Sequence, residues 1–155
     1  MNKQGEIEPG LQRLEKEFGA DRDVDAVYLF GSYAKGRPTP LSDLDIGILL
    51  RDDVPVDSYF SRRLKYMAQC AGALKTDRVD VVLLNNAPLL LAHNIISCRK
   101  VLFERSPEHR VAFEVDRIAR FLDFKPFMEV RMKYMKDQIL WERSLTNPLV
   151  LSKRQ

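Results

Sequence analysis

Two aspartates that open an apolar segment restrict the fold of this chain more than any other feature. Asp43 and Asp45 flank Leu44, and apolar residues continue to Leu50. Residues two apart on a β-strand project from the same face, so both aspartates point together while the alternating apolar side chains face a core. Carboxylates this close repel each other unless they share a proton or hold a cation between them. The segment Leu44–Leu50 therefore predicts a strand, buried on both faces along its apolar end, with a charged site where it begins.

A third aspartate, Asp80, lies inside another apolar segment, Arg78–Leu84. An ionised carboxylate in a buried strand is costly unless it is paired or bound to a metal. Mg²⁺ prefers oxygen ligands and commonly binds through one or two carboxylates together with substrate phosphates. Three strand carboxylates that meet could hold two such ions, which would activate an attacking oxygen and stabilise a leaving one. Alternatives stay open: the paired aspartates could form a solvated face or bind calcium, and Asp80 could pair with Arg78 or cap a turn.

Gly31 and Ser32 follow the segment Val24–Phe30, whose β-branched and aromatic residues predict a strand. Glycine lets the backbone approach a phosphate closely, and the amides of a short following helix can bind phosphate oxygens together with the serine hydroxyl. Lys35 and Arg37 could add positive charge against a triphosphate. The spacing is not that of a P-loop or of a dinucleotide-binding motif. A simple turn with solvated loop charges is the competing interpretation.

The remaining segments predict helices packed on this sheet. An opening helix is predicted with Leu11, Leu14 and Phe18 on one face. A second helix, capped by Asp57, is predicted to carry on one face Phe60, Leu64, Met67, Ala71 and Leu74. A third helix has Pro88 in its first turn and runs through Ile96, and a short edge strand follows at Lys100–Glu104. The order of elements predicts an α+β (α/β-like) fold, a small mixed β-sheet with packed helices.

From Ser106 to about residue 145 the pattern is helical, and Pro126 is expected to break or kink the helix. Its apolar stripes are Val111, Val115, Ile118 and Leu122, then Met128, Met132, Met135 and Ile139 beside Phe127, Val130, Tyr134 and Trp141. The last two stripes together make a face wider than one core contact needs. This face could pack on the chain's own sheet, on a second copy or on a partner. We predict a core over residues 1–105 and a C-terminal helical extension over 106–155.

Composition indicates a globular protein. Of 155 residues, 45% are hydrophobic and 30% are charged, and the net charge of +3 is too small to indicate direct nucleic-acid binding. Cys70 and Cys98 have no metal-site spacing and are expected to be buried thiols. His93 and His109 are expected to be structural. The polar first ten residues and the lack of a long apolar run predict a cytoplasmic protein without a membrane segment.

The ordered set Phe30-Gly31-Ser32, ten residues, Asp43-Leu44-Asp45 and a later Asp80 resembles the DNA polymerase β-type nucleotidyltransferase superfamily. Within it, the chain is most similar to the MNT-domain branch, the MntA-like antitoxins of HEPN/MNT toxin–antitoxin systems. The similar wording includes GSYAKG, SDLDIGILL and DRVDVVLLN, and a weaker likeness reaches about Ile139. Lys35 stands where many relatives have arginine, which keeps the charge but loses the bidentate fork.

The resemblance implies a nucleotidyltransferase fold and a role for each matching residue. Gly31 and Ser32 would hold the phosphates of ATP, and Asp43 and Asp45 would ligate Mg²⁺. Asp80 would ligate the metal that activates the acceptor hydroxyl, or act as its base. The implied reaction transfers AMP from ATP to a tyrosine of a cognate HEPN-type RNase toxin (HepT-like) in a hetero-oligomer, which neutralises the toxin.

Two other functions remain open on sequence grounds. One is a non-catalytic antitoxin that masks its partner by binding. The other is a small-molecule (antibiotic) nucleotidyltransferase, although the short segment after Asp80 leaves little room for the acceptor domain that such enzymes usually carry.

Overall fold

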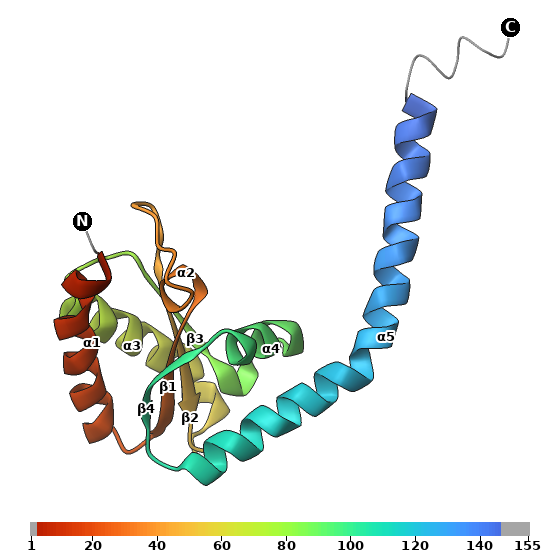
Figure 1. The fold of residues 1–155 in the computed structure, drawn as a ribbon. Coiled ribbons are helices and arrows are strands. Elements are labelled where there is room, and N and C mark those ends of the chain that lie inside the picture. Colours follow the sequence, from red (N-terminus) through yellow and green to blue (C-terminus); the bar gives the residue numbers. More distant parts are fainter. Residues whose placement is uncertain (1–2, 147–155) are drawn as a thin grey trace, which may run out of the picture. The chain divides into compact units, whose positions relative to one another are not determined.

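The computed structural model describes the backbone of residues 3–146 and the side chains of residues 7–143, with a four-stranded mixed sheet that has helices on both faces (Figure 1). The elements are α1 (Lys3–Ala20), β1 (Val24–Phe30), α2 (Gly31–Ala34), β2 (Leu44–Leu50), the 3-10 turn η1 (Val56–Ser58), α3 (Tyr59–Leu74), β3 (Val79–Leu83), the 3-10 turn η2 (Leu84–Asn86), α4 (Leu89–Ser97), β4 (Lys100–Glu104) and α5 (Pro107–Thr146). The predicted α+β fold is confirmed. Residues 1–2 belong to the predicted polar N-terminus and residues 147–155 to the predicted C-terminal extension. Both ranges lie outside the residues that the structure describes.

The strands are ordered β3-β2-β1-β4. β1 pairs antiparallel with β2 and with β4, whereas β2 and β3 are parallel. Parallel neighbours need a crossover connection, and α3 supplies it between β2 and β3. The predicted edge strand is β4, and β3 forms the other edge. Leu44 lies opposite Val79 in the parallel pair, and this register continues to the end of β3.

The sheet is buried on both faces, as the continuous apolar run of β2 predicts. One core lies under α1 and α3 and contains Leu14, Phe18, Ile46, Ile48, Tyr66 and Val81, among others. The second core contains Tyr28, Leu49, Leu84, Ala92 and Ile95, which α4 covers. Figure 1 shows α1 and α3 on one side of the strands and α4 on the other. Residues that alternate along one strand therefore enter two different cores.

The buried face of α3 differs from the predicted one. Phe60 and Leu64 are 72% and 51% exposed, whereas Leu74 is buried and Met67 packs partly buried against the core, as predicted. The other buried residues of α3 are Tyr59, Tyr66, Cys70 and Ala73. The sequence of α3 contains two overlapping apolar stripes, and the predicted stripe is only partly the buried one. Which stripe is buried depends on the position of α1 and β3, which local sequence does not reveal. Asp57 is also not the cap, since it lies within η1 and the N-cap position of α3 is Ser58.

The start of α5 is joined to β1 by a buried polar cluster. The Tyr28 hydroxyl donates to Glu114 Oε1 at 3.1 Å, and Glu114 is only 5% exposed. Arg99 donates to Glu114 Oε2 at 2.6 Å, and Arg110 donates to Oε1 at 3.0 Å. Burial and then the charge of Glu114 raise the pKa of Tyr28 far above its ordinary value, so its hydroxyl stays a donor. Two arginines thus neutralise the buried carboxylate.

The chain divides into two compact units, residues 1–118 and 119–155, so that α5 contributes to both. The second unit is described only as far as residue 146 and is helical over that length. α5 continues through Pro126, so of the predicted break or kink the break does not occur there, and the kink stays a prediction. The predicted stripe Val111, Val115, Ile118 and Leu122 is exposed. The predicted boundary near residue 105 stays a prediction.

One cysteine prediction is wrong. Cys70 is buried, and burial raises the pKa of its thiol to about 12, whereas Cys98 is exposed. Cys98 follows the last turn of α4 as its C-cap residue, and the apolar pattern of that helix ends before it. Among the described helices, none combines the length and the apolar character that crossing a bilayer requires.

Candidate functional site

The register of the sheet brings the predicted carboxylates together. Asp45 lies directly opposite Asp80 in the parallel pairing of β2 and β3. Both side chains point away from the core under α1 and α3, because their neighbours Leu44, Val79 and Val81 belong to that core. Asp43 precedes β2 by one residue and is exposed. The two strands therefore present their acids on one face, at the end where β2 begins.

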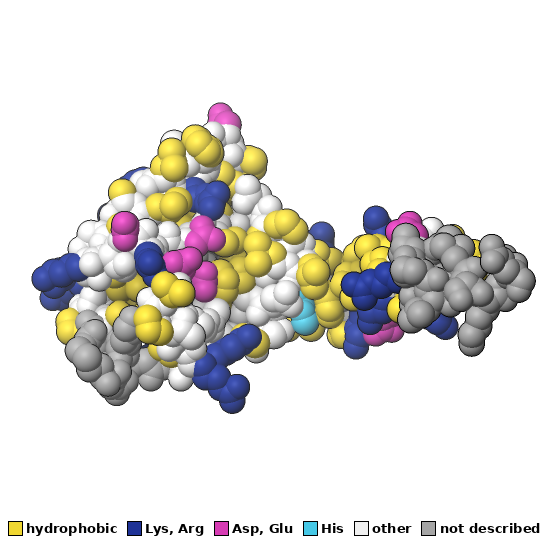
Figure 2. Space-filling view, turned by 90° about the horizontal axis from the view of Figure 1, so that it is seen from above, with side chains coloured by type: hydrophobic (Ala, Val, Ile, Leu, Met, Phe, Trp, Pro, Cys, Tyr) yellow, Lys and Arg dark blue, Asp and Glu magenta, His cyan; other side chains and the backbone are white. Residues whose placement is uncertain are grey.

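The electrostatics of Asp45 reflect its two acidic neighbours. Burial, followed by the charges of Asp80 and Asp43, raises the pKa of the Asp45 carboxyl above its usual range. A raised carboxyl pKa means that the ionised form is held at a cost in free energy. Figure 2, which looks down on this end of the sheet, shows acidic side chains gathered in one patch with hydrophobic side chains beside it. Such a patch favours the binding of a cation.

The close approach of the chain to the Asp45 carboxylate requires a glycine at position 31. Its φ angle is +70°, a conformation that other residues rarely adopt. A Cβ at this position would overlap the Asp45 carboxylate, with Oδ2 as the nearest atom. Asp45 also lies opposite Phe30 in the pairing with β1, so the turn into α2 passes directly beside the carboxylate. The sequence predicted a glycine beside a phosphate, and the structure adds that this glycine makes room for the carboxylate.

We expect Gly31→Ala to impair both stability and activity. The positive φ alone costs about 1–3 kcal/mol for a residue with a Cβ, and the overlap would push Asp45 out of place. Gly36→Ala is the matched control, because Gly36 has a similar φ of +69°. Chemical denaturation and an AMP-transfer assay would separate the two contributions. Equal loss of activity in both variants would show that backbone strain, and not the Asp45 contact, causes the effect.

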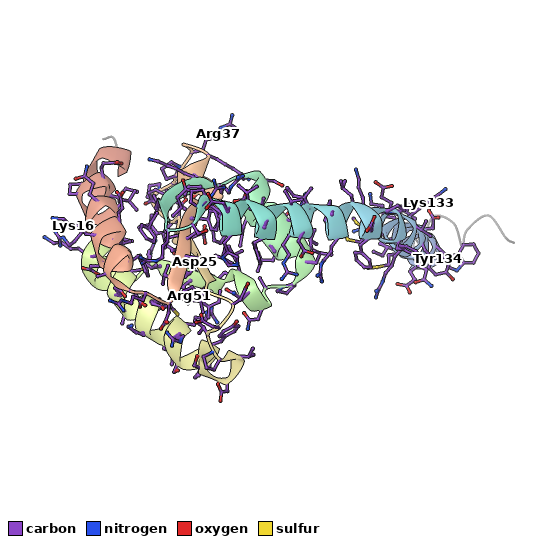
Figure 3. The ribbon with its side chains drawn as sticks, turned by 90° about the horizontal axis from the view of Figure 1, so that it is seen from below. Lys16, Asp25, Arg37, Arg51, Lys133 and Tyr134 are labelled. Carbon is purple, nitrogen blue, oxygen red and sulfur yellow. The ribbon has the colours of Figure 1, made fainter. Side chains whose placement is uncertain are left out.

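The loop from α2 to β2 carries the other predicted residues. Lys35 is the C-cap residue of α2, and its N–H donates to the Gly31 carbonyl at 3.2 Å. The N–H of Arg37 donates to the Ser32 carbonyl at 3.0 Å. Both basic side chains are exposed, and Figure 3 shows Arg37 pointing outward. The structure thus places Gly31 beside the Asp45 carboxylate, with Ser32 next to it in the chain, and shows no contact from the described Lys35 or Arg37 side chain to the acids.

A hydrogen-bonded turn between Thr39 and Ser42 fixes the backbone just before Asp43. The Thr39 N–H donates to Ser42 Oγ at 2.8 Å, and the Ser42 N–H donates to the Thr39 carbonyl at 3.1 Å. The Leu44 N–H then donates to the Arg78 carbonyl at 2.9 Å, which begins the ladder with β3. These bonds hold the backbone on both sides of Asp43, so its carboxylate lies beside the ladder that carries the other two.

Arg63 is a site residue that sequence reasoning missed. Its Nη2 lies 3.1 Å from Asp80 Oδ1, in an ion pair, and its Nε–H donates to the Val81 carbonyl at 2.7 Å. The sequence left open a pairing of Asp80 with Arg78, but Arg78 donates to the Pro40 carbonyl instead. No sequence pattern points to Arg63, because the direction of its side chain depends on which face of α3 is buried.

The two histidines lie outside this site. His109 is held between two carboxylates, with Nδ1 2.6 Å from Asp25 Oδ2 and Nε2 3.2 Å from Asp52 Oδ2. Figure 3 places Asp25 near Arg51, at the end of β2 remote from Asp45. His93 lies half-buried in α4. These positions agree with structural roles for both residues.

The donor set fits a hard divalent cation, although the acids alone do not form a closed metal cage. Within the described residues, no three His, Cys, Asp or Glu side chains are placed to enclose a metal ion. Arg63 occupies one oxygen of Asp80. Mg²⁺ usually needs only one or two carboxylates when phosphates and water complete its shell. Asp43, Asp45 and Asp80 fit that kind of shared site.

Residues 12–108 match the family described as "Polymerase beta, Nucleotidyltransferase". No curated protein matches the chain significantly by sequence. The matched segment includes α2, β2 and β3, and therefore all three acids. The chain belongs to the polymerase β-type nucleotidyltransferase family.

Solved structures of toxin–antitoxin complexes share its fold. A chain of a toxin–antitoxin structure with AMP-PNP aligns with a TM-score of 0.62 at 24% identity, covering 83% of this chain and 98% of that one. A chain of the MntA–HepT complex gives 0.57 at 21% identity, with 84% and 97% covered. A chain of the Shewanella oneidensis complex of tri-AMPylated HEPN toxin with MNT antitoxin gives 0.57 at 22% identity, with 84% and 96% covered.

Proposed function

We propose that this chain is an MntA-like antitoxin that transfers AMP from ATP to a tyrosine of a cognate HEPN-type RNase toxin in a Mg²⁺-dependent reaction. The observation that carries the proposal is the register of Asp45 opposite Asp80, with Gly31 packed against Asp45. Membership of the nucleotidyltransferase family supports the reaction type. The acceptor is suggested by relatives of the same fold, one described with AMP-PNP and one with an AMPylated HEPN toxin.

The chain's residues divide the work of nucleotide binding. Gly31 and Ser32 would hold the triphosphate through backbone amides and the serine hydroxyl. Lys35 and Arg37 are exposed on the following loop and could reach the outer phosphates. Asp43 and Asp45 would hold Mg²⁺ together with Asp80. When bound, Mg²⁺ neutralises charge on the phosphates and favours the ionised acceptor hydroxyl.

The transfer itself exchanges one bond to phosphorus for another. The tyrosine oxygen bonds to the α-phosphorus of ATP, the bond from that phosphorus to the β-phosphate oxygen breaks, and pyrophosphate leaves. The phenol has an ordinary pKa near ~10, so its proton must be removed as the bond forms. Asp80, at the edge of the sheet and half exposed, is the candidate to receive it if it acts as the base and not as a metal ligand.

A protein acceptor needs a docking surface, and α5 offers one. Phe127, Val130 and Tyr134 are 72%, 72% and 66% exposed in the single chain. The neighbouring stripe is half exposed, with exposed fractions of 53%, 50% and 50% for Met132, Met135 and Ile139. Soluble proteins rarely leave so continuous an apolar surface uncovered. We infer that the toxin covers this face in a hetero-oligomer.

We expect Val130→Asp in α5 to weaken capture of the toxin by at least about tenfold, since a buried unpaired charge costs several kcal/mol. Lys136→Glu is the matched control: it also changes charge at an exposed position of α5, but six residues after Val130 it lies well around the helix from Val130. Co-purification and calorimetry with the co-expressed toxin would measure the change. Unaltered affinity in Val130→Asp would remove α5 as the docking element.

The direct test is transfer of label. The chain is incubated with α-labelled ATP, Mg²⁺ and a co-expressed HEPN-type RNase toxin, and this candidate partner is analysed by intact mass. AMP added to the partner, dependent on Mg²⁺ and absent in Asp43→Ala/Asp45→Ala, supports the proposal. Unmodified partner that is still silenced by the double variant at equal dose, without ATP, would instead establish masking by binding. Transfer to an aminoglycoside or lincosamide in place of the protein would establish the small-molecule enzyme.

A further inference from the structure

Arg63 is fixed in two ways at the edge of the sheet. It projects from α3, which covers the opposite face from the acids, and reaches them around β3. Because β3 is an edge strand, part of its backbone has no strand partner, and the Val81 carbonyl accepts the Arg63 Nε–H at 2.7 Å. The same guanidinium then extends to Asp80 Oδ1 at 3.1 Å. Its planar fork therefore links the position of Asp80 to the backbone of the neighbouring residue.

This contact places a positive charge where the proposed reaction needs a divalent cation. Asp80 lies opposite Asp45, and the acids repel each other unless counter-charge is present. Arg63 offers one positive charge to Asp80, and its anchor on Val81 prevents it from moving far. A divalent cation that approaches Asp80 thus meets a carboxylate with one oxygen already engaged and a fixed cation beside it. Arginine cannot be deprotonated at any ordinary pH, so this charge is permanent.

We propose that Arg63 is a positioning residue that holds Asp80 in place and competes with a divalent cation for it. The inference rests on the proposed function, because it assumes that the acids bind such a cation. Arg63 keeps Asp80 aligned with Asp45 and weakens cation binding by the protein alone. The added negative charge of the nucleotide phosphates then favours cation binding at the complete site. Arg63 in this way couples the loading of the cation to the presence of nucleotide.

The test measures Mn²⁺ binding to the full chain by calorimetry, with and without a non-hydrolysable ATP analogue. In the absence of nucleotide, Arg63→Gln should bind Mn²⁺ about five- to tenfold more tightly, the size expected for removing a cation a few ångströms away at a protein surface. Arg63→Lys should remain near the wild type, since it keeps the charge. The gain should disappear in Arg63→Gln/Asp80→Asn, which lacks the carboxylate for which the two cations compete.

Arg62→Gln is the matched control, because Arg62 neighbours Arg63 on α3 but pairs with Asp23 at 2.6 Å. Its Mn²⁺ affinity should not change. Thermal unfolding confirms that each variant is folded, and the half-exposed Arg63 makes a large loss of stability unexpected. Equal or weaker Mn²⁺ binding in folded Arg63→Gln would overturn this inference while leaving the proposed function intact. Absence of Mn²⁺ binding in every protein, even with nucleotide, would overturn the proposed function and this inference with it.

Discussion

Asp45→Asn is expected to abolish AMP transfer and to make the protein more stable. Loss of one carboxylate from the cluster removes roughly 4 kcal/mol or more of transition-state stabilisation, which corresponds to about a thousandfold in rate. Stability should change in the opposite direction, because burial and the charges of Asp80 and Asp43 disfavour the ionised Asp45 carboxyl. A rise in melting temperature of roughly 2–4 °C corresponds to about 1 kcal/mol in a chain of this size.

The pH dependence of that gain identifies its cause. The pKa of Asp45 is raised in the folded protein above the ordinary 3.8, so ionisation costs stability at neutral pH. That cost is relieved as the pH falls through the raised pKa, and the advantage of Asp45→Asn should shrink over the same range. Differential scanning calorimetry between neutral pH and the acid range measures this. Asp57→Asn, an exposed acid in η1, should show no gain at any pH. A stability gain that does not depend on pH would contradict the electrostatic explanation.

Glu114→Ala is expected to cost about 3 kcal/mol of unfolding free energy, the usual result of breaking a buried ion pair by removing one partner. The substitution leaves Arg99, Arg110 and the Tyr28 hydroxyl without their shared acceptor. Arg110 should lose only part of its pairing, because its Nε–H keeps a 2.6 Å hydrogen bond to Glu104. The melting temperature should fall by roughly 6–12 °C.

Glu114→Gln separates charge from shape. It keeps an acceptor for Tyr28 but no longer neutralises two guanidinium groups, so its loss should lie between those of the wild type and Glu114→Ala. Urea titration of the three proteins gives the order. Glu108→Ala, at an exposed position in the first turn of α5, serves as the surface control. A loss in Glu114→Ala no larger than in Glu108→Ala would mean that the start of α5 is not held by this cluster.

The strands and the order of the site motif could be predicted because local pattern determines them. The predicted strands Val24–Phe30, Leu44–Leu50 and Lys100–Glu104 coincide with β1, β2 and β4. Alternation along a strand placed Asp43 and Asp45 on one face, and this needs no knowledge of distant residues. The motif order that joins Gly31-Ser32 to the acids agreed with the family that the chain matches.

Helix faces were predicted less well, because a helix with apolar residues on several sides does not reveal which side is buried. Phe60 and Leu64 looked like core residues, yet α1 and β3 cover the face that carries Tyr66 and Cys70. That single error concealed Arg63, whose direction follows from the orientation of α3. The environment of Cys98 was missed for a related reason, since the burial of a residue after a helix depends on where the chain turns next.

By itself, the sequence determined which residues could do chemistry, because spacing of two along a strand and a glycine after a strand are local properties. Only the tertiary structure decided that residue 80 stands beside residue 45, that Gly31 must lack a side chain, and that Arg63 reaches the acids around a sheet edge. Those facts depend on strand register and helix orientation, which arise from contacts between segments far apart in the chain.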